Sequence, residues 1–261
     1  SALSRSGRLG HSILFKLPEK KERVLLWKHY TKHMSCSPHI DWDRVAKMST
    51  GVTPADIQMA ANNAGLHALR HHQNQIETKN LLASVEDLLW GEYRDNLPMD
   101  KDELYRTCVH EAGHAMVSFL HSLDMDRVCV RPRGDALGFV RLSPQEGRYG
   151  LLQGDIIARI GMAFAGGIAE KVVFASHGTG VSSDLSHVRN LAFQAVRVCG
   201  MHPSLPQGVN SNPFAPAPSQ DLVKKAEEAE REIVEGSRQA TDQFLEKNKE
   251  TLIELAKWLY E

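Results

Sequence analysis

The chain has 261 residues and a balanced charge, with 31 lysines and arginines against 32 acidic residues and a formal net charge of −1. This balance excludes the strongly basic field typical of nucleic-acid-binding proteins, so no nucleic-acid partner is expected. The length allows one large or two ordinary domains, and no apolar run approaches the roughly 20 residues that span a bilayer.

The first 92 residues are predicted to form a small all-helical module. Thr53 can cap a helix, Pro54 suits its first position, and Asp56 lies near the positive end of the helix dipole. Helices are expected over Lys20–His33 and over Asp41–Ala46, and two more are expected to begin at Thr53 and at Thr78. The helix that begins at Thr53 places an apolar stripe on a single face: Ile57, Ala60, Ala61, Ala64 and Ala68.

Residues 93–261 are predicted to form a second, mainly helical domain with a small β element. A polar linker, Glu92–Lys101, separates it from the first module. The expected elements are a helix over Asp102–Ser122, extended stretches at Arg127–Val130 and Gly138–Leu142, a long apolar helix over Leu152–Phe174 interrupted at Gly166-Gly167, a helix that ends at Gly200, and two terminal helices, from Leu222 and over Glu250–Tyr260.

The sequence His110-Glu111-Ala112-Gly113-His114 has the HExxH pattern of zinc hydrolases. Residues four apart on a helix lie one turn apart on the same face, so the two imidazoles can bind one zinc ion. The glutamate beside the first histidine then reaches a water on that ion and can accept its proton. The four cysteines form no CxxC pair, so a zinc knuckle is not expected and a reducing compartment is favoured.

A catalytic zinc site usually has three protein ligands, so a third must be found. An HExxHxxGxxH layout fails because Val117 and Leu120 occupy the required positions. His121 lies two helical turns from His114, about 10 Å along the axis, which is too far for one ion. A glutamate some twenty residues downstream would fall near Gly134, in a turn without glutamate.

The remaining candidates are Glu170, His177, Asp184 and His187. Asp184 is favoured because it follows the Gly178–Gly180 loop and lies in the first turn of the next helix, where its carboxylate can face a metal ion. Glu170 could orient a zinc-binding histidine or form an ordinary ion pair. Both His177 and His187 are expected to pack or to face solvent, although His177 could line the cleft.

Four stretches of the chain resemble the peptidase domain of the FtsH family, which comprises membrane-anchored, ATP-dependent zinc proteases of bacteria, mitochondria and chloroplasts. They are TCVHEAGHAMV, VRPRGDALGFVRLSP, AGGIAEKVVF and GTGVSSDLSHVRNLAFQAVRVCGM. In that family the third zinc ligand is the aspartate of a TGAS-(N/S)-D stretch. The resemblance therefore implies that Asp184, at the end of Thr179–Asp184, completes the site with His110 and His114, and that Glu111 is the catalytic base.

The N-terminal region also resembles this family. SRSGRLGHSILFKLP is similar to the end of an AAA+ ATPase core, and GVTPADIQMAANNAGLHALR to the AAA+ helical lid. Residues 1–92 are thus expected to be the end of that core with its lid, and residues 93–261 the zinc peptidase. Arg5 and Arg8 match the two arginine-finger positions that act on a neighbour's ATP. Because no GxxxxGK[ST] loop occurs, the nucleotide-binding core is absent and this chain alone is expected to have no ATPase activity.

Three departures indicate a divergent member of the family. Gly10 and Asn63 replace an aspartate and a glutamate that the family usually carries, and Ala165-Gly166-Gly167 stands where Gly-Gly-Arg is common.

In the family an edge strand pairs with the extended substrate. That role implies substrate binding by Gly138, Phe139 and Val140, the alternative being an internal hairpin strand.

The resemblance implies a zinc metalloendopeptidase with one Zn²⁺ per chain, acting on unfolded or damaged proteins and using ATP only through the missing core. It also implies a homo-oligomer, a hexamer in the parent protein, attached to a membrane through a segment outside this chain. The peptidase would face a cytosol-, matrix- or stroma-like compartment, and this fragment itself would be soluble. The alternative is a non-proteolytic relative that acts as an assembly or unfolding module with a structural zinc, but the intact Glu111 argues against it.

Overall fold

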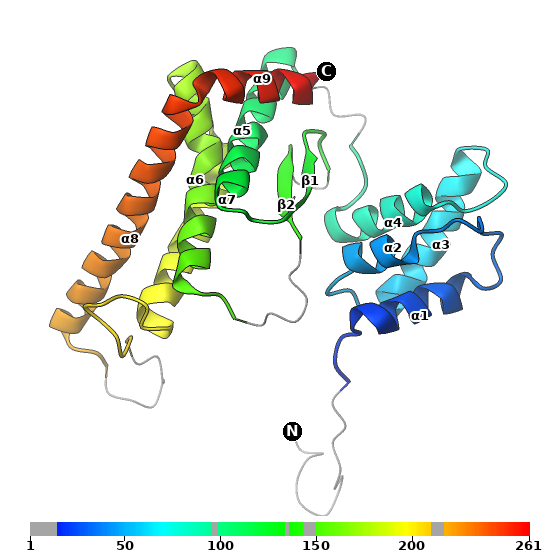
Figure 1. Ribbon diagram of the computed structural model, residues 1–261, viewed down its shortest axis with the longest axis horizontal. Coiled ribbons are helices and arrows are strands. Elements are labelled where there is room, and N and C mark those ends of the chain that lie inside the picture. The colour runs from blue at the N-terminus through cyan, green and yellow to red at the C-terminus, as the bar shows by residue number, and fades with distance from the viewer. Residues whose placement is uncertain (1–14, 95–98, 134–135, 144–149, 210–216) are drawn as a thin grey trace, which may run out of the picture. The chain divides into compact units, whose positions relative to one another are not determined.

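A computed structural model describes residues 15–94, 99–133, 136–143, 150–209 and 217–261. The chain forms two compact units, Ser1–Glu92 and Tyr93–Glu261. Both are built from helices, and the described residues contain one sheet of two strands (Figure 1). The mainly α fold with a small β element is therefore confirmed. The predicted arginine fingers, Arg5 and Arg8, lie outside the described residues.

The first unit is a cluster of helices around one apolar core, α1 (Lys20–Thr31), α2 (Trp42–Met48), α3 (Pro54–Arg70) and α4 (Thr78–Trp90). The predicted cap of α3 is confirmed, because the Asp56 amide donates to Thr53 Oγ1 at 3.2 Å and the Thr53 amide donates to Asp56 Oδ2 at 3.3 Å. The apolar stripe of α3 is buried. Trp27 lies fully buried in the core, where its indole nitrogen donates to Ser49 Oγ at 3.0 Å.

The second unit is built on two long neighbouring helices, α5 (Lys101–Leu120) and α6 (Gln153–Phe174). In Figure 1, α8 runs alongside α6 and α9 crosses the end of α5. The other elements are β1 (Met125–Cys129), β2 (Phe139–Leu142), a 3₁₀ turn (Thr179–Val181), α7 (Ser182–Phe193), a π-helical segment (Gln194–Val198), α8 (Gln220–Lys247) and α9 (Lys249–Tyr260). The antiparallel strands pair Cys129 with Phe139 and Val128 with Val140.

Helices α5 and α6 approach closely because small residues face each other where they meet. A β-carbon on Gly113 would lie 2.6 Å from both the carbonyl oxygen of Ala165 and the β-carbon of Ala169. The expected interruption at Gly166-Gly167 is wrong, because α6 continues through both glycines to Phe174. These glycines serve close packing instead: a β-carbon on Gly166 would collide with the His110 ring, and one on Gly167 would lie 2.8 Å from Val181.

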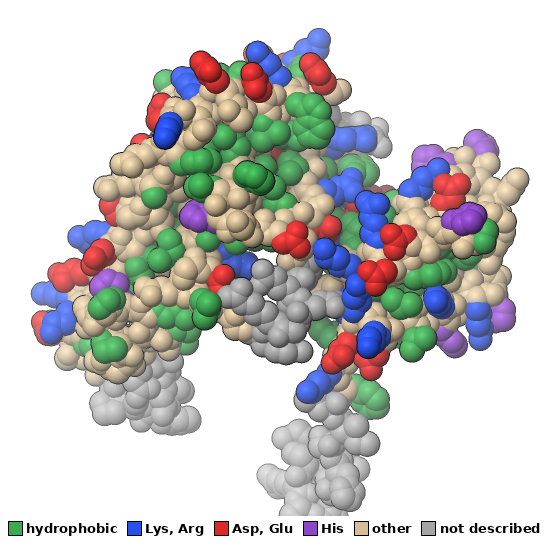
Figure 2. Space-filling view, viewed as in Figure 1, with side chains coloured by type: hydrophobic (Ala, Val, Ile, Leu, Met, Phe, Trp, Pro, Cys, Tyr) green, Lys and Arg blue, Asp and Glu red, His purple; other side chains and the backbone are tan. Residues whose placement is uncertain are grey.

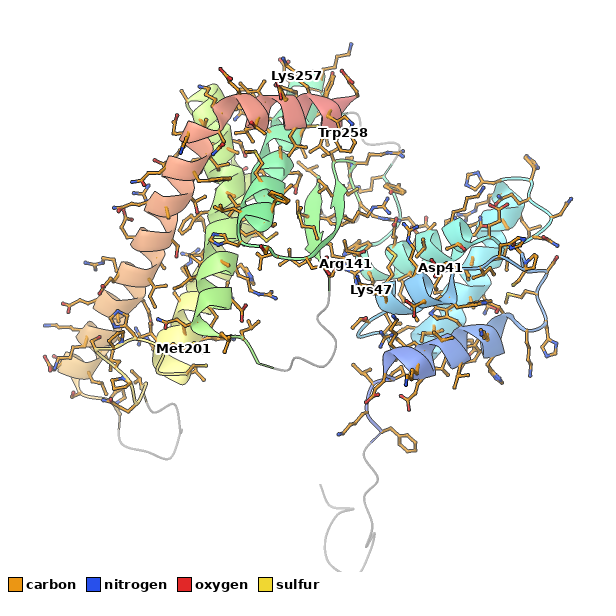
Figure 3. The ribbon with its side chains drawn as sticks, viewed as in Figure 1. Asp41, Lys47, Arg141, Met201, Lys257 and Trp258 are labelled. Atoms are coloured by element: carbon orange, nitrogen blue, oxygen red, sulfur yellow. The ribbon has the colours of Figure 1, made fainter. Side chains whose placement is uncertain are left out.

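Apolar side chains from several helices pack around α5 and α6 and form the core of the second unit. One core cluster joins α5, α6, α8 and α9, and a second joins α6 and α7, with Met201 (Figure 3) packed against it. On the visible face of α8 and α9, acidic and basic side chains are interspersed rather than gathered by sign (Figure 2). None of the helices in the described part of the chain has the length and apolarity needed to span a membrane.

The contact between α5 and α6 predicts opposite effects for two glycine-to-alanine substitutions. Gly113→Ala should destabilise the second unit by about 1–3 kcal/mol, since the added methyl group overpacks the helix crossing. Gly236→Ala is the control, because Gly236 is exposed within α8 with no atom near the added methyl. It should stabilise the unit by about 0.5–1 kcal/mol through lower chain entropy in the unfolded state. Urea unfolding followed by circular dichroism measures both, and equal effects would contradict the close contact.

Candidate metal centre

One face of α5 directs His110 and His114 towards the same point, with their ring centroids 4.7 Å apart. The Nδ1 atom of His114 lies 2.7 Å from the Met162 carbonyl oxygen, and that of His110 lies 2.8 Å from Glu170 Oε1. Both neighbours are acceptors, so each Nδ1 carries the proton in the neutral ring. Each Nε2 therefore keeps a lone pair for a metal ion.

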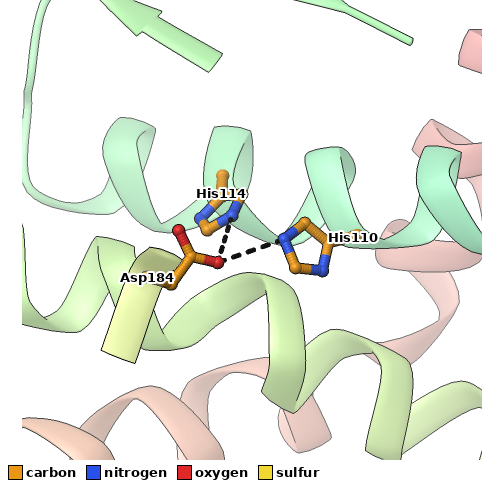
Figure 4. Close-up of side chains that lie close together, drawn as sticks. All are labelled: His110, His114 and Asp184. Atoms are coloured by element: carbon orange, nitrogen blue, oxygen red, sulfur yellow. Dashed lines mark ion pairs between the residues drawn. The ribbon is translucent and has the colours of Figure 1, made fainter. Parts of the chain in front are cut away.

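Asp184 reaches the two imidazoles from the first turn of α7. The 3₁₀ turn before it is anchored by Val181, whose side chain is buried against Gly167 of α6. Asp184 Oδ2 lies 3.2 Å from His110 Nε2 and 3.5 Å from His114 Nε2 (Figure 4). Helices α5 and α7, which are far apart in the sequence, thus contribute ligands to one cluster.

The donor set fits a zinc ion. One ligand atom from each of His110, His114 and Asp184 lies within 4.8 Å of the others. Ligand atoms about 2.0–2.1 Å from a tetrahedral zinc are about 3.3–3.5 Å apart, close to the separations from Oδ2. This buried Oδ2 atom has no well-formed hydrogen bond within the described residues, as expected for an atom that faces an ion rather than a donor.

The acidic neighbours dominate the electrostatics of the cluster. Burial disfavours the charged form of His110, but the close carboxylates of Asp184 and Glu170 outweigh it and raise the pKa of that imidazole to about 10, so that a metal ion binding at Nε2 displaces a proton. Burial likewise opposes ionisation of Asp184 and Glu170. For Asp184 the contacts with His110 and His114 prevail and hold its pKa below the ordinary range. The pKa of Glu170 is also lowered, by its contacts with His110, the Gly178 amide and Arg106. Both carboxylates are therefore held in the ionised, acceptor form.

Glu111 lies beside the cluster and is nearly inaccessible, with 4% of its surface exposed. Its Oε1 atom packs against Gly138, where a β-carbon would lie only 2.8 Å away. Its Oε2 atom is buried and has no hydrogen-bond partner in the described parts of the chain. Burial raises the pKa of Glu111 to about 7, although the two neighbouring histidines act to lower it. This value suits a group that accepts and returns a proton near neutral pH.

An open cavity of about 920 Å³ lies over the cluster. Its walls include the α5 face with Glu111, the start of α7 with Asp184, and Gly138, Phe139 and Val140 at the beginning of β2. Strand β2 has β1 on one side and no strand on its other side among the residues described. The proposed substrate residues thus lie at a sheet edge that borders the metal ligands.

The sequence around this cluster matches a known family. The sequence profile of peptidase family M41 matches residues 98–261, which include the whole cluster. The chain belongs to peptidase family M41. Residues 39–83 match the AAA+ lid domain.

Relatives in this family share the name ATP-dependent zinc metalloprotease FtsH. The chain is 31% identical to the one from Chlorobium luteolum over 270 residues, covering 99% of the chain and 38% of the relative. It is 33% identical to the one from Pelodictyon phaeoclathratiforme over 208 residues, covering 78% and 31%. The chain therefore spans about a third of the length of these relatives.

The other candidate donors of this M41 chain lie outside the cluster. His121 caps the C-terminal end of α5. His177 is exposed and is not among the described residues that line the cavity, although its Nδ1 lies 3.1 Å from the carbonyl oxygen of Gly178, which does line it. His187 lines the cavity but is exposed. Glu170 combines the two roles expected as alternatives, because it contacts His110 and also forms an ion pair with Arg106.

Two contributors to the M41 site were not found from the sequence. Arg106 lies one helical turn before His110, a spacing that could have indicated a neighbour of the site. The carbonyl of Met162 orients His114, and a backbone group leaves no residue-type signal in a sequence. Both depend on how α6 packs against α5.

The cluster predicts that Asp184→Asn loses zinc while His187→Asn retains it. Removing a direct ligand should weaken zinc binding by more than the tenfold to hundredfold that loss of an outer partner costs. His187→Asn is the control because His187 lines the same cavity and contributes no ligand. Zinc per chain is measured by atomic emission after dialysis against a weak chelator. Full zinc content in Asp184→Asn would show that another residue is the third ligand.

Proposed function

We propose that this chain is the proteolytic portion of an ATP-dependent zinc endopeptidase that cleaves unfolded or damaged proteins. The observation that carries the proposal is the convergence of His110, His114 and Asp184 beside the buried, unpartnered oxygen of Glu111. A structural zinc site needs no such base. The relatives' name, ATP-dependent zinc metalloprotease FtsH, agrees with this chemistry.

In the proposed reaction, His110 and His114 would hold a zinc ion through Nε2, and Asp184 would hold it through Oδ2. The bound ion would supply an acidified water and a Lewis acid for the peptide carbonyl. Glu111 Oε2 accepts the proton of the attacking water and then delivers it to the leaving amine nitrogen. Glu111 Oε1 lies close to Gly138, and Oε2, which is buried and has no hydrogen-bond partner among the described residues, remains free to accept that proton.

The substrate is proposed to bind as an extended strand along β2, through Gly138, Phe139 and Val140. Backbone hydrogen bonds along a free strand edge bind a peptide with little dependence on its side chains. That mode suits a protease that acts on many unfolded sequences. An extended segment bound at this edge would bring its backbone alongside the metal ligands, because the same residues line the cavity above them.

The remaining parts of the proposal concern the parent protein. ATP hydrolysis would be carried out by an AAA+ core, to which the lid match at residues 39–83 points. Arg5 and Arg8 would then act on a neighbour's nucleotide in a homohexamer. Membrane attachment would use a segment outside this sequence, with the peptidase facing a cytosol-, matrix- or stroma-like compartment.

Glu111→Gln tests the base directly. The substitution should lower the peptidase rate by about a hundredfold to ten-thousandfold, the usual contribution of a general base, and should leave zinc content unchanged. Glu103→Gln is the matched control, since Glu103 lies on the same helix and lines the same cavity without contacting the cluster. Cleavage of fluorescent casein by the assembled full-length protein is the measurement.

The outcomes separate the two functional classes. Wild-type activity in Glu111→Gln would remove Glu111 from the mechanism. A wild-type protein that binds one zinc per chain yet cleaves nothing when assembled with ATP would overturn the peptidase proposal and favour an assembly or unfolding module.

A further inference from the structure

We propose that Arg106 is a positioning residue that sets the metal affinity of the site through Glu170. The proposal rests on the zinc site of the proposed function and adds a residue that contacts no metal ligand atom itself. Arg106 lies on α5 one turn before His110, and its Nη1 atom donates to Glu170 Oε2 at 2.9 Å.

Glu170 links Arg106 to the metal centre, because it contacts both Arg106 and His110. Its side chain is 4% exposed, and both oxygens are engaged. Oε1 lies 2.8 Å from His110 Nδ1, while Oε2 accepts from Arg106 and, at 2.9 Å, from the Gly178 amide. Arg106 thus fixes the rotation of the carboxylate that orients the first histidine. Such charge-assisted hydrogen bonds are directional, and partners of this kind hold a metal-binding imidazole in place.

The same arginine also holds the loop that leads to the third ligand. Nη1 donates to the Ser176 carbonyl at 3.2 Å, just after α6 ends. Together with the bond from the Gly178 amide to Glu170, this fixes two backbone groups of the loop between α6 and the 3₁₀ turn. Asp184 lies in the first turn of α7, which begins where the 3₁₀ turn ends. One ion pair therefore restrains both the α5 ligand His110 and the approach to Asp184.

The position of Arg106 is itself fixed by packing. Its guanidinium lies over the Phe174 ring, 4.4 Å from the centroid, and its side chain is 36% exposed. An ordinary surface ion pair between flexible side chains would contribute little to stability and would not hold one geometry. Here one partner is buried and the other is stacked on an aromatic ring, so the pair keeps a single geometry.

Arg106→Met is the informative substitution, because methionine keeps an apolar stem over Phe174 and removes the charge and the donors. We expect the zinc dissociation constant to rise about tenfold, the lower end of the range for loss of an outer partner. Arg106→Lys keeps the charge but loses the planar guanidinium that stacks on Phe174, so an intermediate value is expected. Arg238→Met, at an exposed pair with Glu235 on α8, is the matched control and should leave zinc affinity unchanged.

The dissociation constant is measured on the purified chain by competition with a chromophoric chelator, and the visible spectrum of the cobalt-substituted protein reports ligand geometry. A double-mutant cycle with Glu170→Gln decides whether Arg106 acts through Glu170. If it does, Arg106→Met has little further effect in the Glu170→Gln background. An equal loss in both backgrounds, or an Arg106→Met affinity equal to that of the wild type, overturns the proposal. Because zinc binding is measured without peptidase activity, this failure is distinct from failure of the Glu111 test.

Discussion

The close contact of α5 with α6 is the constraint on which the metal centre depends. Gly113 lets the two helices approach until its α-carbon lies against the Ala165 carbonyl, and Gly166 leaves room for the His110 ring. At this separation α6 supplies an acceptor to each histidine, Glu170 to one and the Met162 carbonyl to the other. The orientation of both imidazoles is therefore a property of helix packing, and the tight interior of a protein makes such packing rigid.

Acidic side chains surround the two histidines of the cluster. Glu111, Glu170 and Asp184 place three carboxyl groups in a small, largely buried volume, where Glu170 pairs with Arg106 and His110, and Asp184 with His110 and His114. Buried carboxylates are costly unless they are paired. A divalent ion held by the two imidazoles and Asp184 would take over the positive charge that a protonated His110 otherwise supplies. The arrangement of acids thus agrees with the donor geometry in favouring a divalent cation.

Much of this structure could be predicted from the sequence because its signals are local. The Thr53–Asp56 cap and the apolar stripe of α3 follow from spacing within a few residues, and both are confirmed. Spacing on one helix also placed His110 and His114 together. Asp184 was harder, since nothing in its local sequence states which distant helix it faces, and family resemblance supplied that link.

The predictions that failed concern features that arise from packing. Gly166-Gly167 was expected to interrupt α6, because glycine disfavours helix in isolation. In the structure their lack of side chains makes room for His110 and Val181, so the helix continues. The π-helical segment after α7 and the bridging role of Arg106 likewise depend on neighbours in space. A sequence read one segment at a time does not contain those neighbours.

The division of the ligands between α5 and α7 has a thermodynamic consequence. An ion bound by His110, His114 and Asp184 cross-links two helices, and it binds the folded state alone if the unfolded chain cannot assemble the set. Mass action then adds about 4 kcal/mol to the free energy of unfolding when free zinc is a thousand times its dissociation constant. The lifetime of the folded domain would follow the zinc supply of its compartment, so zinc starvation would lower the amount of protein before it limited the rate of each molecule.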